Sequence, residues 1–191
     1  MIRALPTFRE LVAHFPDHEG FPTPALLDSI GGEVRARIRD SDNTCAIRLS
    51  YTLNKAGAPL RLAPGLHMLK SAPQTIPGTA HHSHPVTKPD LYLYRVLEMK
   101  QYLVARYGQG VRIYNGYRPN QFRQPPPIRG ATQGIIAFTW EGPFNAFSAT
   151  GHMDLYRGLL TGDPQTLGAN CIGECYFNVG PMIADFWEVR P

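Results

Sequence analysis

The chain has 191 residues, of which 43% are hydrophobic and 18% are charged, and its formal net charge is +4 with histidine neutral. This composition excludes an intrinsically disordered chain, and the length suits a single domain over residues 1–191 with a sizeable core. No run of ~18 apolar residues is present, so we expect no membrane partner, and the first ten residues lack a secretory signal pattern. The basic residues are scattered and not interleaved with aromatic ones, so we expect no nucleic-acid partner.

The earlier elements are expected to be helices. Apolar side chains recur with helical spacing in several short segments, and Gly31-Gly32 separates two of them. The strongest pattern starts at Pro89, which suits a first helical turn, and Gly108 ends it. The predicted helices cover residues 7–15, 25–30, 33–38, 45–54 and 89–107.

The later elements are expected to be strands, because β-branched and aromatic residues replace the helical pattern after Gly134. Two segments rich in proline and glycine, 58–89 and 114–133, are expected to be loops. Helices followed by strands predict an α+β fold. The predicted strands cover residues 135–140, 151–156, 175–179 and 185–189.

A cysteine stands where a polar, turn-forming stretch meets an apolar-periodic segment. Asp42 or Asn43 can serve as N-cap, which places Cys45 in the first turn of a helix. Backbone N–H groups there lack partners, and the helix dipole favours an anion. A helix N-terminus is one of the standard ways to lower the pKa of a cysteine. Cys45 is therefore a candidate nucleophile.

A thiolate nucleophile needs a base within hydrogen-bond reach. Of the seven histidines, only His152 lies in a predicted strand. A cysteine on a helix, followed about a hundred residues later by a histidine, is the order of papain-like hydrolases, although both residues can also simply belong to the core. The cluster His81-His82-Ser83-His84 lacks neighbouring cysteine or carboxylate ligands, so we expect it to be solvated, with no metal or cofactor.

Cys171 and Cys175 lie four residues apart, whereas Cys45 is alone in the sequence. One close pair and one odd thiol suggest a local disulfide and a reactive cysteine. Three reduced cysteines are the alternative.

Four segments resemble the fourth family of type VI secretion amidase effectors: Asn43–Asn54, Tyr92–Met99, Gly134–Ala137 and Ala149–Tyr156. They occur in the order of the family, and the resemblance extends from residue 43 to residue 177. It implies a papain-like fold of the NlpC type, in which N-terminal helices pack on a C-terminal antiparallel sheet. It also implies that the cysteine pair matches a pair in the family.

The resemblance implies an antibacterial effector, made in the producer's cytoplasm and injected into the periplasm of a competing cell. Its implied activity is hydrolysis of the peptidoglycan stem peptide between D-glutamate, at its γ-carboxyl, and meso-diaminopimelate, through a thioester. The implied partners are stem peptides, the type VI secretion machinery and a cognate immunity protein. Another papain-like cell-wall endopeptidase and a non-catalytic cell-wall binding module are the alternatives.

By the same resemblance, Cys45 matches the nucleophile of the family and His152 its base. Arg48 follows Cys45 by one helical turn and can pair with a substrate carboxylate or form a structural salt bridge.

The sequence differs from the pattern of the family at the third catalytic residue. In the family this residue is an aspartate that lies between two closely spaced cysteines. Gly173 occupies that position here, with Glu174 beside it. We rank Glu174 first, then Asp163 in an inserted stretch, then Asp154, which shares a strand face with His152. A backbone carbonyl can also orient the imidazole.

Overall fold

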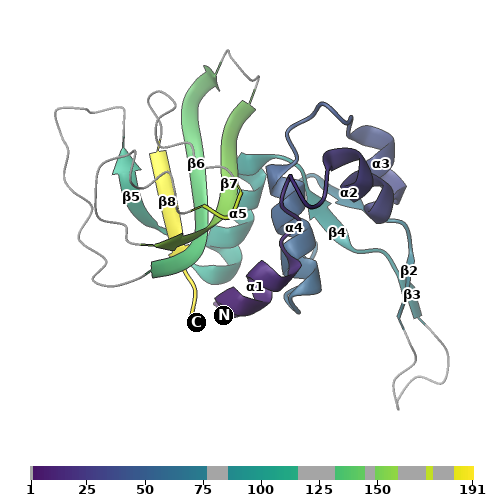
Figure 1. Cartoon of the computed structure of the whole chain (residues 1–191), viewed down its shortest axis with the longest axis horizontal. Helices are drawn as coiled ribbons and strands as arrows, with labels where there is room; N and C mark the ends of the chain where they lie inside the picture. The colour runs from purple at the N-terminus through teal and green to yellow at the C-terminus, as the bar shows by residue number, and fades with distance from the viewer. Residues whose placement is uncertain (1, 77–85, 116–131, 145–148, 159–170, 174–182) are drawn as a thin grey trace.

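The structure, a computed structural model, describes residues 2–76, 86–115, 132–144, 149–158, 171–173 and 183–191. Figure 1 shows the helices and the small strands on one side of the molecule and the larger sheet on the other. The helices are α1 (Phe8–His14), α2 (Thr23–Ile30), α3 (Gly32–Arg37), α4 (Cys45–Lys55) and α5 (Val96–Tyr107). The strands are β1 (Met68–Lys70), β2 (Gln74–Ile76), β3 (Val86–Lys88), β4 (Leu91–Leu93), β5 (Val111–Asn115), β6 (Thr132–Phe144), β7 (Ala149–Gly158) and β8 (Ile183–Glu188).

Local sequence accounts for the ends of the early helices. Helix α1 begins with a capping box, in which the side chains of Thr7 and Glu10 each bond the other's backbone N–H. Helices α2 and α3 are separated by Gly31 and Gly32, whose φ angles are 63° and 60°. A Cβ at Gly32 would lie 2.4 Å from the carbonyl carbon of Ser71, so glycine is required for this close approach. The first four predicted helices are confirmed.

The larger sheet is antiparallel, with the strand order β5-β8-β6-β7. Strand β7 is therefore an edge strand, and β6 pairs with it through Phe138 opposite His152 and Ile136 opposite Asp154. Alternate residues of β7 face opposite sides of the sheet, so His152 and Asp154 share one face while Met153 and Leu155 share the other.

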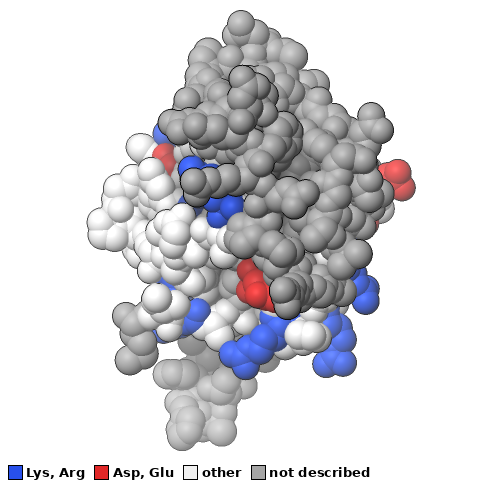
Figure 2. All heavy atoms as spheres, turned by 90° about the vertical axis from the view of Figure 1, so that its left-hand side faces the viewer, with Lys and Arg blue, Asp and Glu red and all other residues white. Residues whose placement is uncertain are grey.

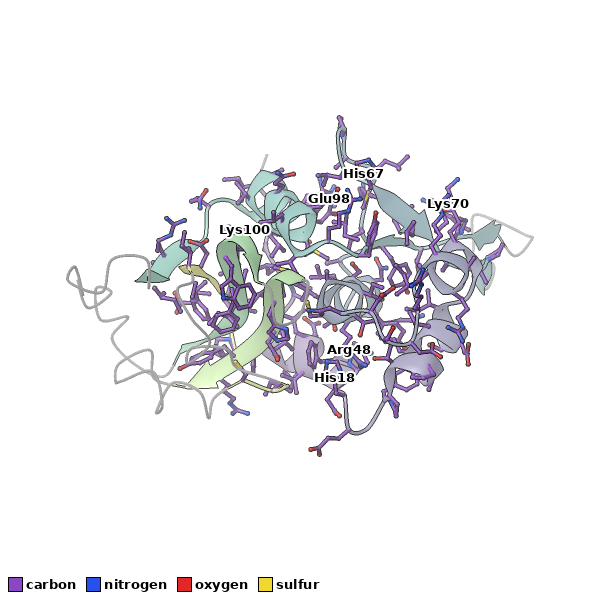
Figure 3. The ribbon with its side chains drawn as sticks, turned by 90° about the horizontal axis from the view of Figure 1, so that it is seen from above. His18, Arg48, His67, Lys70, Glu98 and Lys100 are labelled. Atoms are coloured by element: carbon purple, nitrogen blue, oxygen red, sulfur yellow. The ribbon has the colours of Figure 1, made fainter. Side chains whose placement is uncertain are left out.

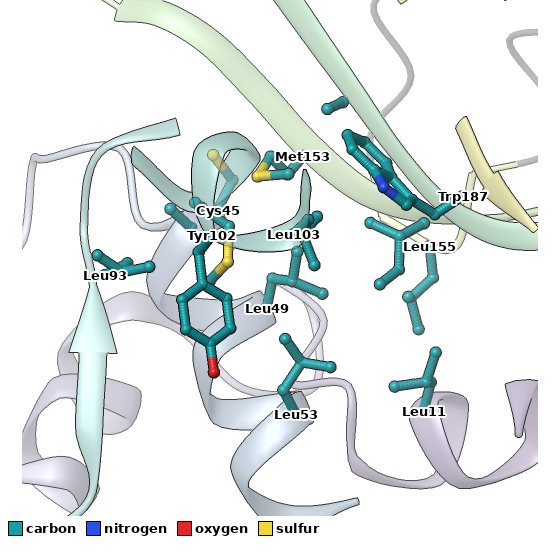
Figure 4. Close-up of a cluster of buried hydrophobic side chains, with 14 of the residues drawn as sticks. Leu11, Cys45, Leu49, Leu53, Leu93, Tyr102, Leu103, Met153, Leu155 and Trp187 are labelled. Atoms are coloured by element: carbon teal, nitrogen blue, oxygen red, sulfur yellow. The ribbon is translucent and has the colours of Figure 1, made fainter. Parts of the chain in front are cut away.

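The main core lies between the helices and the face of the sheet that carries Met153 and Leu155 (Figure 4). A second core packs α2 and α3 against α4 and the small strands β1 and β4. None of the described helices is long and apolar enough to cross a bilayer. The second core consists of Leu26, Leu27, Ile30, Val34, Ile38, Ile47, Leu69 and Tyr92.

One predicted helix is wrong at its start, and two predicted loops contain strands. Leu91–Leu93 forms β4, which pairs with Met68–Lys70, and α5 begins only at Val96. The hydroxyl of Ser50 in α4 accepts from the Leu93 N–H at 3.0 Å, which gives this backbone a non-local partner. Strands β1, β2 and β3 lie within the predicted loop 58–89, and β5 reaches into the predicted loop 114–133. The predicted strand 175–179 and residues 81–84 lie outside the described residues.

Figure 2 looks onto the side of the molecule where β5 lies. Most of the charged atoms coloured on this face belong to Lys or Arg. They form separate groups among the described residues, which matches the scattered basic residues of the sequence.

Candidate active site

Helix α4 begins at Cys45, which is a free thiol and only 2% exposed. Thr44, not Asp42 or Asn43, is the N-cap residue, and its side chain makes no capping hydrogen bond. The Asn43 side chain instead accepts from the Cys45 N–H at 3.0 Å. The Cys45 N–H, which lies at the start of the helix backbone, is therefore already hydrogen-bonded to the side chain of Asn43.

His152 lies on β7 and is 4% exposed. Its ring stacks on Phe138 of β6, with ring centroids 6.2 Å apart and an interplanar angle of 27°. The preceding Gly151 lets β7 approach α5, because a Cβ there would lie 2.7 Å from a methyl carbon of Val96 and 2.4 Å from the Phe138 carbonyl oxygen. Phe138 thus packs against the imidazole, and Gly151 allows the close packing of β7 beside it. The sequence alone indicates neither role.

The structure brings Cys45 and His152 close together, so that the thiol and the imidazole interact. His152 lies on the sheet face opposite the core, but because β7 is an edge strand its side chain can reach an element packed beside the edge. Burial lowers the pKa of His152, but the interactions with Asp154 and Cys45 outweigh it and raise the pKa to about 10. The surroundings therefore favour the imidazolium.

Asp154 is the third titratable group, 1% exposed, with Oδ2 3.5 Å from His152 Nε2. Its Oδ1 accepts from the backbone N–H groups of Leu155, at 2.6 Å, and Gly173, at 3.1 Å. These two donors hold the carboxylate in place beside the imidazole. Glu174 and Asp163 lie outside the described residues.

The segment 171–173 lies alongside β7 next to this carboxylate. The backbone of Cys171 pairs with that of Tyr156 in an isolated antiparallel β-bridge. The Ile172 N–H donates to the Leu155 carbonyl at 2.8 Å. A Cβ at Gly173 would lie 2.7 Å from Asp154 Oδ2, so only glycine brings its N–H this close without moving the carboxylate. Cys175 lies outside the described residues.

Arg48 is not available to a substrate carboxylate, because it is 1% exposed. No described carboxylate forms a salt bridge with it either, so neither sequence-based interpretation of Arg48 holds. Its guanidinium donates instead to neutral oxygens. The acceptors are the carbonyls of Pro16, Asp17 and Phe21 and the hydroxyls of Thr23 and Thr44.

A family model described as type VI secretion system (T6SS), amidase effector protein 4, matches residues 41–185. The chain is also similar to the solved structure of the type VI effector Tae4 from Enterobacter cloacae, at 24% identity over 100% of both chains and a TM-score of 0.63. A second similar structure is Tae4 from Salmonella typhimurium in complex with the immunity protein Tai4 from Enterobacter cloacae. The identity is 23%, over 96% of this chain and 99% of that one, and the TM-score is 0.63. No curated protein matches the sequence.

These structural matches confirm the expected papain-like, NlpC-type fold, with N-terminal helices packed on a C-terminal antiparallel sheet. The family model covers most of the chain and all of the described part of the Cys45–His152–Asp154 cluster. The chain therefore belongs to the type VI secretion system amidase effector protein 4 family.

Proposed function

We propose that the chain is a cysteine amidase that hydrolyses the peptidoglycan stem peptide between D-glutamate, at its γ-carboxyl, and meso-diaminopimelate. The observation that carries this proposal is the approach of Cys45 and Asp154 to the buried imidazole of His152, whose pKa they raise to about 10. Such a base stays protonated at neutral pH and stabilises a thiolate beside it. Membership of an amidase family supports an amide as the bond that is attacked.

The reaction is acyl transfer in two steps. The Cys45 thiolate attacks the γ-amide carbonyl and forms a tetrahedral oxyanion. His152 then gives its proton to the diaminopimelate amine as the C–N bond breaks, which leaves a thioester on Cys45. In the second step neutral His152 takes a proton from water as the water oxygen attacks the thioester carbonyl. The C–S bond then breaks, the D-glutamate γ-carboxyl product leaves, and the Cys45 thiolate stays beside the protonated His152.

Asp154 is the group that we propose as the orienting acid. Its Oδ2 lies near Nε2 of His152, which leaves Nδ1 for the thiol. A carboxylate in this position fixes the ring and stabilises the imidazolium without itself taking the proton. Glu174 and Asp163 stay as sequence-based predictions for the same role.

The oxyanion is expected to form beside the start of α4. The Cys45 N–H points there and is bonded to the Asn43 side chain, so the oxyanion has to displace that side chain to use this donor. A donor of this kind is typically worth ~3 kcal/mol in the transition state.

The cysteine pair Cys171–Cys175 is proposed to form a disulfide in the oxidising periplasm. It would hold the segment that includes Gly173 against β7, next to Asp154. We further propose that residues 1–191 act as one amidase domain, delivered by a type VI secretion system into the periplasm of the target cell. A cognate immunity protein would protect the producer, as the solved complexes of Tae4 with Tai4 suggest.

The test is digestion of purified muropeptides by the wild-type chain and by Cys45→Ala, with the products identified by mass spectrometry. We expect the wild type to release fragments cut between D-glutamate and diaminopimelate, and Cys45→Ala to leave the muropeptides intact. Cleavage at another bond would favour a different papain-like endopeptidase. Intact muropeptides with both proteins, together with retained wall binding, would favour a non-catalytic binding module.

A further inference from the structure

Helix α4 carries a buried cation in its first turn, where a cation is disfavoured. Arg48 is 1% exposed and follows Cys45 by three residues. The N-terminal end of a helix carries partial positive charge, and burial removes the hydration of the guanidinium. Burial indeed lowers the pKa of Arg48, although an arginine remains charged in a protein. A cation in this position lowers the stability of the fold. The contacts of Arg48 should therefore indicate which other role it has.

The guanidinium is bonded to the residue that immediately precedes the nucleophile. Its Nε donates to the Thr44 hydroxyl at 3.2 Å, and one terminal nitrogen donates to the Thr23 hydroxyl at 3.1 Å. The two hydroxyls are themselves 3.3 Å apart, which closes a ring of three side chains. The Arg48 backbone N–H also donates to the Thr44 carbonyl at 2.8 Å. Thr44 is thus held by both the side chain and the backbone of Arg48.

The other terminal nitrogen ties a distant segment to the same place. It donates to the carbonyls of Pro16, Asp17 and Phe21, which lie in the connection between α1 and α2. In Figure 3 the labels show His18, which belongs to this connection, next to Arg48. The fork of one arginine therefore joins residues 16–23 to the start of α4. A lysine, whose three donors all lie on one nitrogen, cannot reach all five acceptors.

The guanidinium of Arg48 forms no salt bridge with a described carboxylate. Against the effect of burial, the charges of Asp17 and of the Cys45 thiolate stabilise the guanidinium. The attraction is mutual, so the same cation stabilises the thiolate.

We propose that Arg48 is a positioning residue for Cys45: its fork fixes Thr44 at the start of α4, and its charge favours the thiolate. Arg48 is buried and does not touch the substrate. The inference rests on the proposed function, because it assumes that the Cys45 thiolate attacks the stem peptide.

The experiment compares Arg48→Lys and Thr23→Val with the wild type, using three readouts for each protein. The first is the ultraviolet absorbance of the Cys45 thiolate as a function of pH, from which the absorbance of Cys45→Ala is subtracted. The second is kcat and KM for a muropeptide, and the third is the midpoint of thermal unfolding. For Arg48→Lys we expect thiolate formation to shift upward by about one pH unit and kcat to fall about tenfold or more, with KM little changed. Thr23→Val should also raise the pH of thiolate formation and lower kcat, but by smaller amounts than Arg48→Lys. Arg35→Lys, in an exposed ion pair with Asp28 and Asp40, is the matched control and should change neither.

A lower unfolding midpoint with unchanged thiolate titration and unchanged kcat in the folded protein would show that Arg48 is only structural, and would overturn the inference. If Arg48→Lys does not fold, Thr23→Val decides by the same two readouts. A wild type with no thiolate at neutral pH and no muropeptide cleavage would instead overturn the proposed function itself.

Discussion

The nucleophile and the base are held in different ways. Cys45 depends on hydrogen bonds within the N-terminal part of the chain, where Arg48 and Thr23 hold Thr44 at the start of α4. His152 depends on an edge strand and on a segment that returns to it at Gly173. The first arrangement is a closed network of buried side chains, whereas on the second side the described contacts join an edge strand to the backbone of a distant segment. We therefore expect the base side to be the more easily disturbed by single substitutions.

The largest effect should follow from removing the carboxylate charge on the base side. Asp154→Asn keeps the shape of the side chain but no longer stabilises the imidazolium, so kcat/KM should fall by roughly 10²–10⁴-fold. Steady-state kinetics on a defined muropeptide measure this. Asp185→Asn is the matched control, since Asp185 is also a fully buried carboxylate of the sheet but pairs with Lys100 and Arg112.

Asp185→Asn should lower stability and leave the pH profile of the reaction unchanged. Equal losses of activity in the two variants would contradict a special role for Asp154. In that case Glu174→Ala and Asp163→Ala become the decisive variants for the third residue.

A smaller effect should follow from adding one methyl group beside the same carboxylate. Gly173→Ala places a Cβ 2.7 Å from Asp154 Oδ2, which forces the carboxylate away from His152. Displacements of this size lower rates by up to about a hundredfold. In an Asp154→Asn background the methyl should have little further effect, and a double-mutant cycle on kcat measures this coupling. Additive losses would mean that Gly173 acts elsewhere.

The smallest effect is on stability and depends on pH. The pKa of folded His152 is raised to about 10, above its ordinary value of 6.5. Its contribution to the free energy of unfolding is therefore complete below the unfolded pKa and is lost as the pH rises toward 10, by at most about 1.4 kcal/mol per pH unit. Urea unfolding between these limits should show this slope in the wild type and a flatter one in His152→Gln. The same slope in both proteins would exclude a perturbed His152.

The same two regions differ in how well the sequence predicts them. Cys45 at a helix start follows from local polarity and apolar period, and the structure has α4 where this pattern puts it. The role of Arg48 could not be read locally, because its carbonyl acceptors lie about thirty residues earlier and carry no side-chain signal.

On the base side, Asp154 is the last of the three sequence-based candidates for the orienting acid, and it is the one that lies within the described residues. The structure adds a contact that the sequence does not indicate: the backbone of residues 171–173 approaches β7, and the Gly173 N–H donates to the Asp154 carboxylate. Gly173 was noted as a missing aspartate, whereas its lack of a side chain leaves room for the carboxylate of Asp154. The mistaken helix start at Pro89 has the same origin, since Leu91–Leu93 pairs with a strand more than twenty residues away.

The central claim is that Cys45, His152 and Asp154 form one charged site across these two regions. An NMR titration of the His152 imidazole in the wild type, in Cys45→Ala and in Asp154→Asn tests it most directly. We expect a pKa near 10 in the wild type and a clearly lower value in each variant, because each loses one of the two groups that stabilise the imidazolium. A wild-type pKa near 6.5 that neither substitution changes would contradict the account.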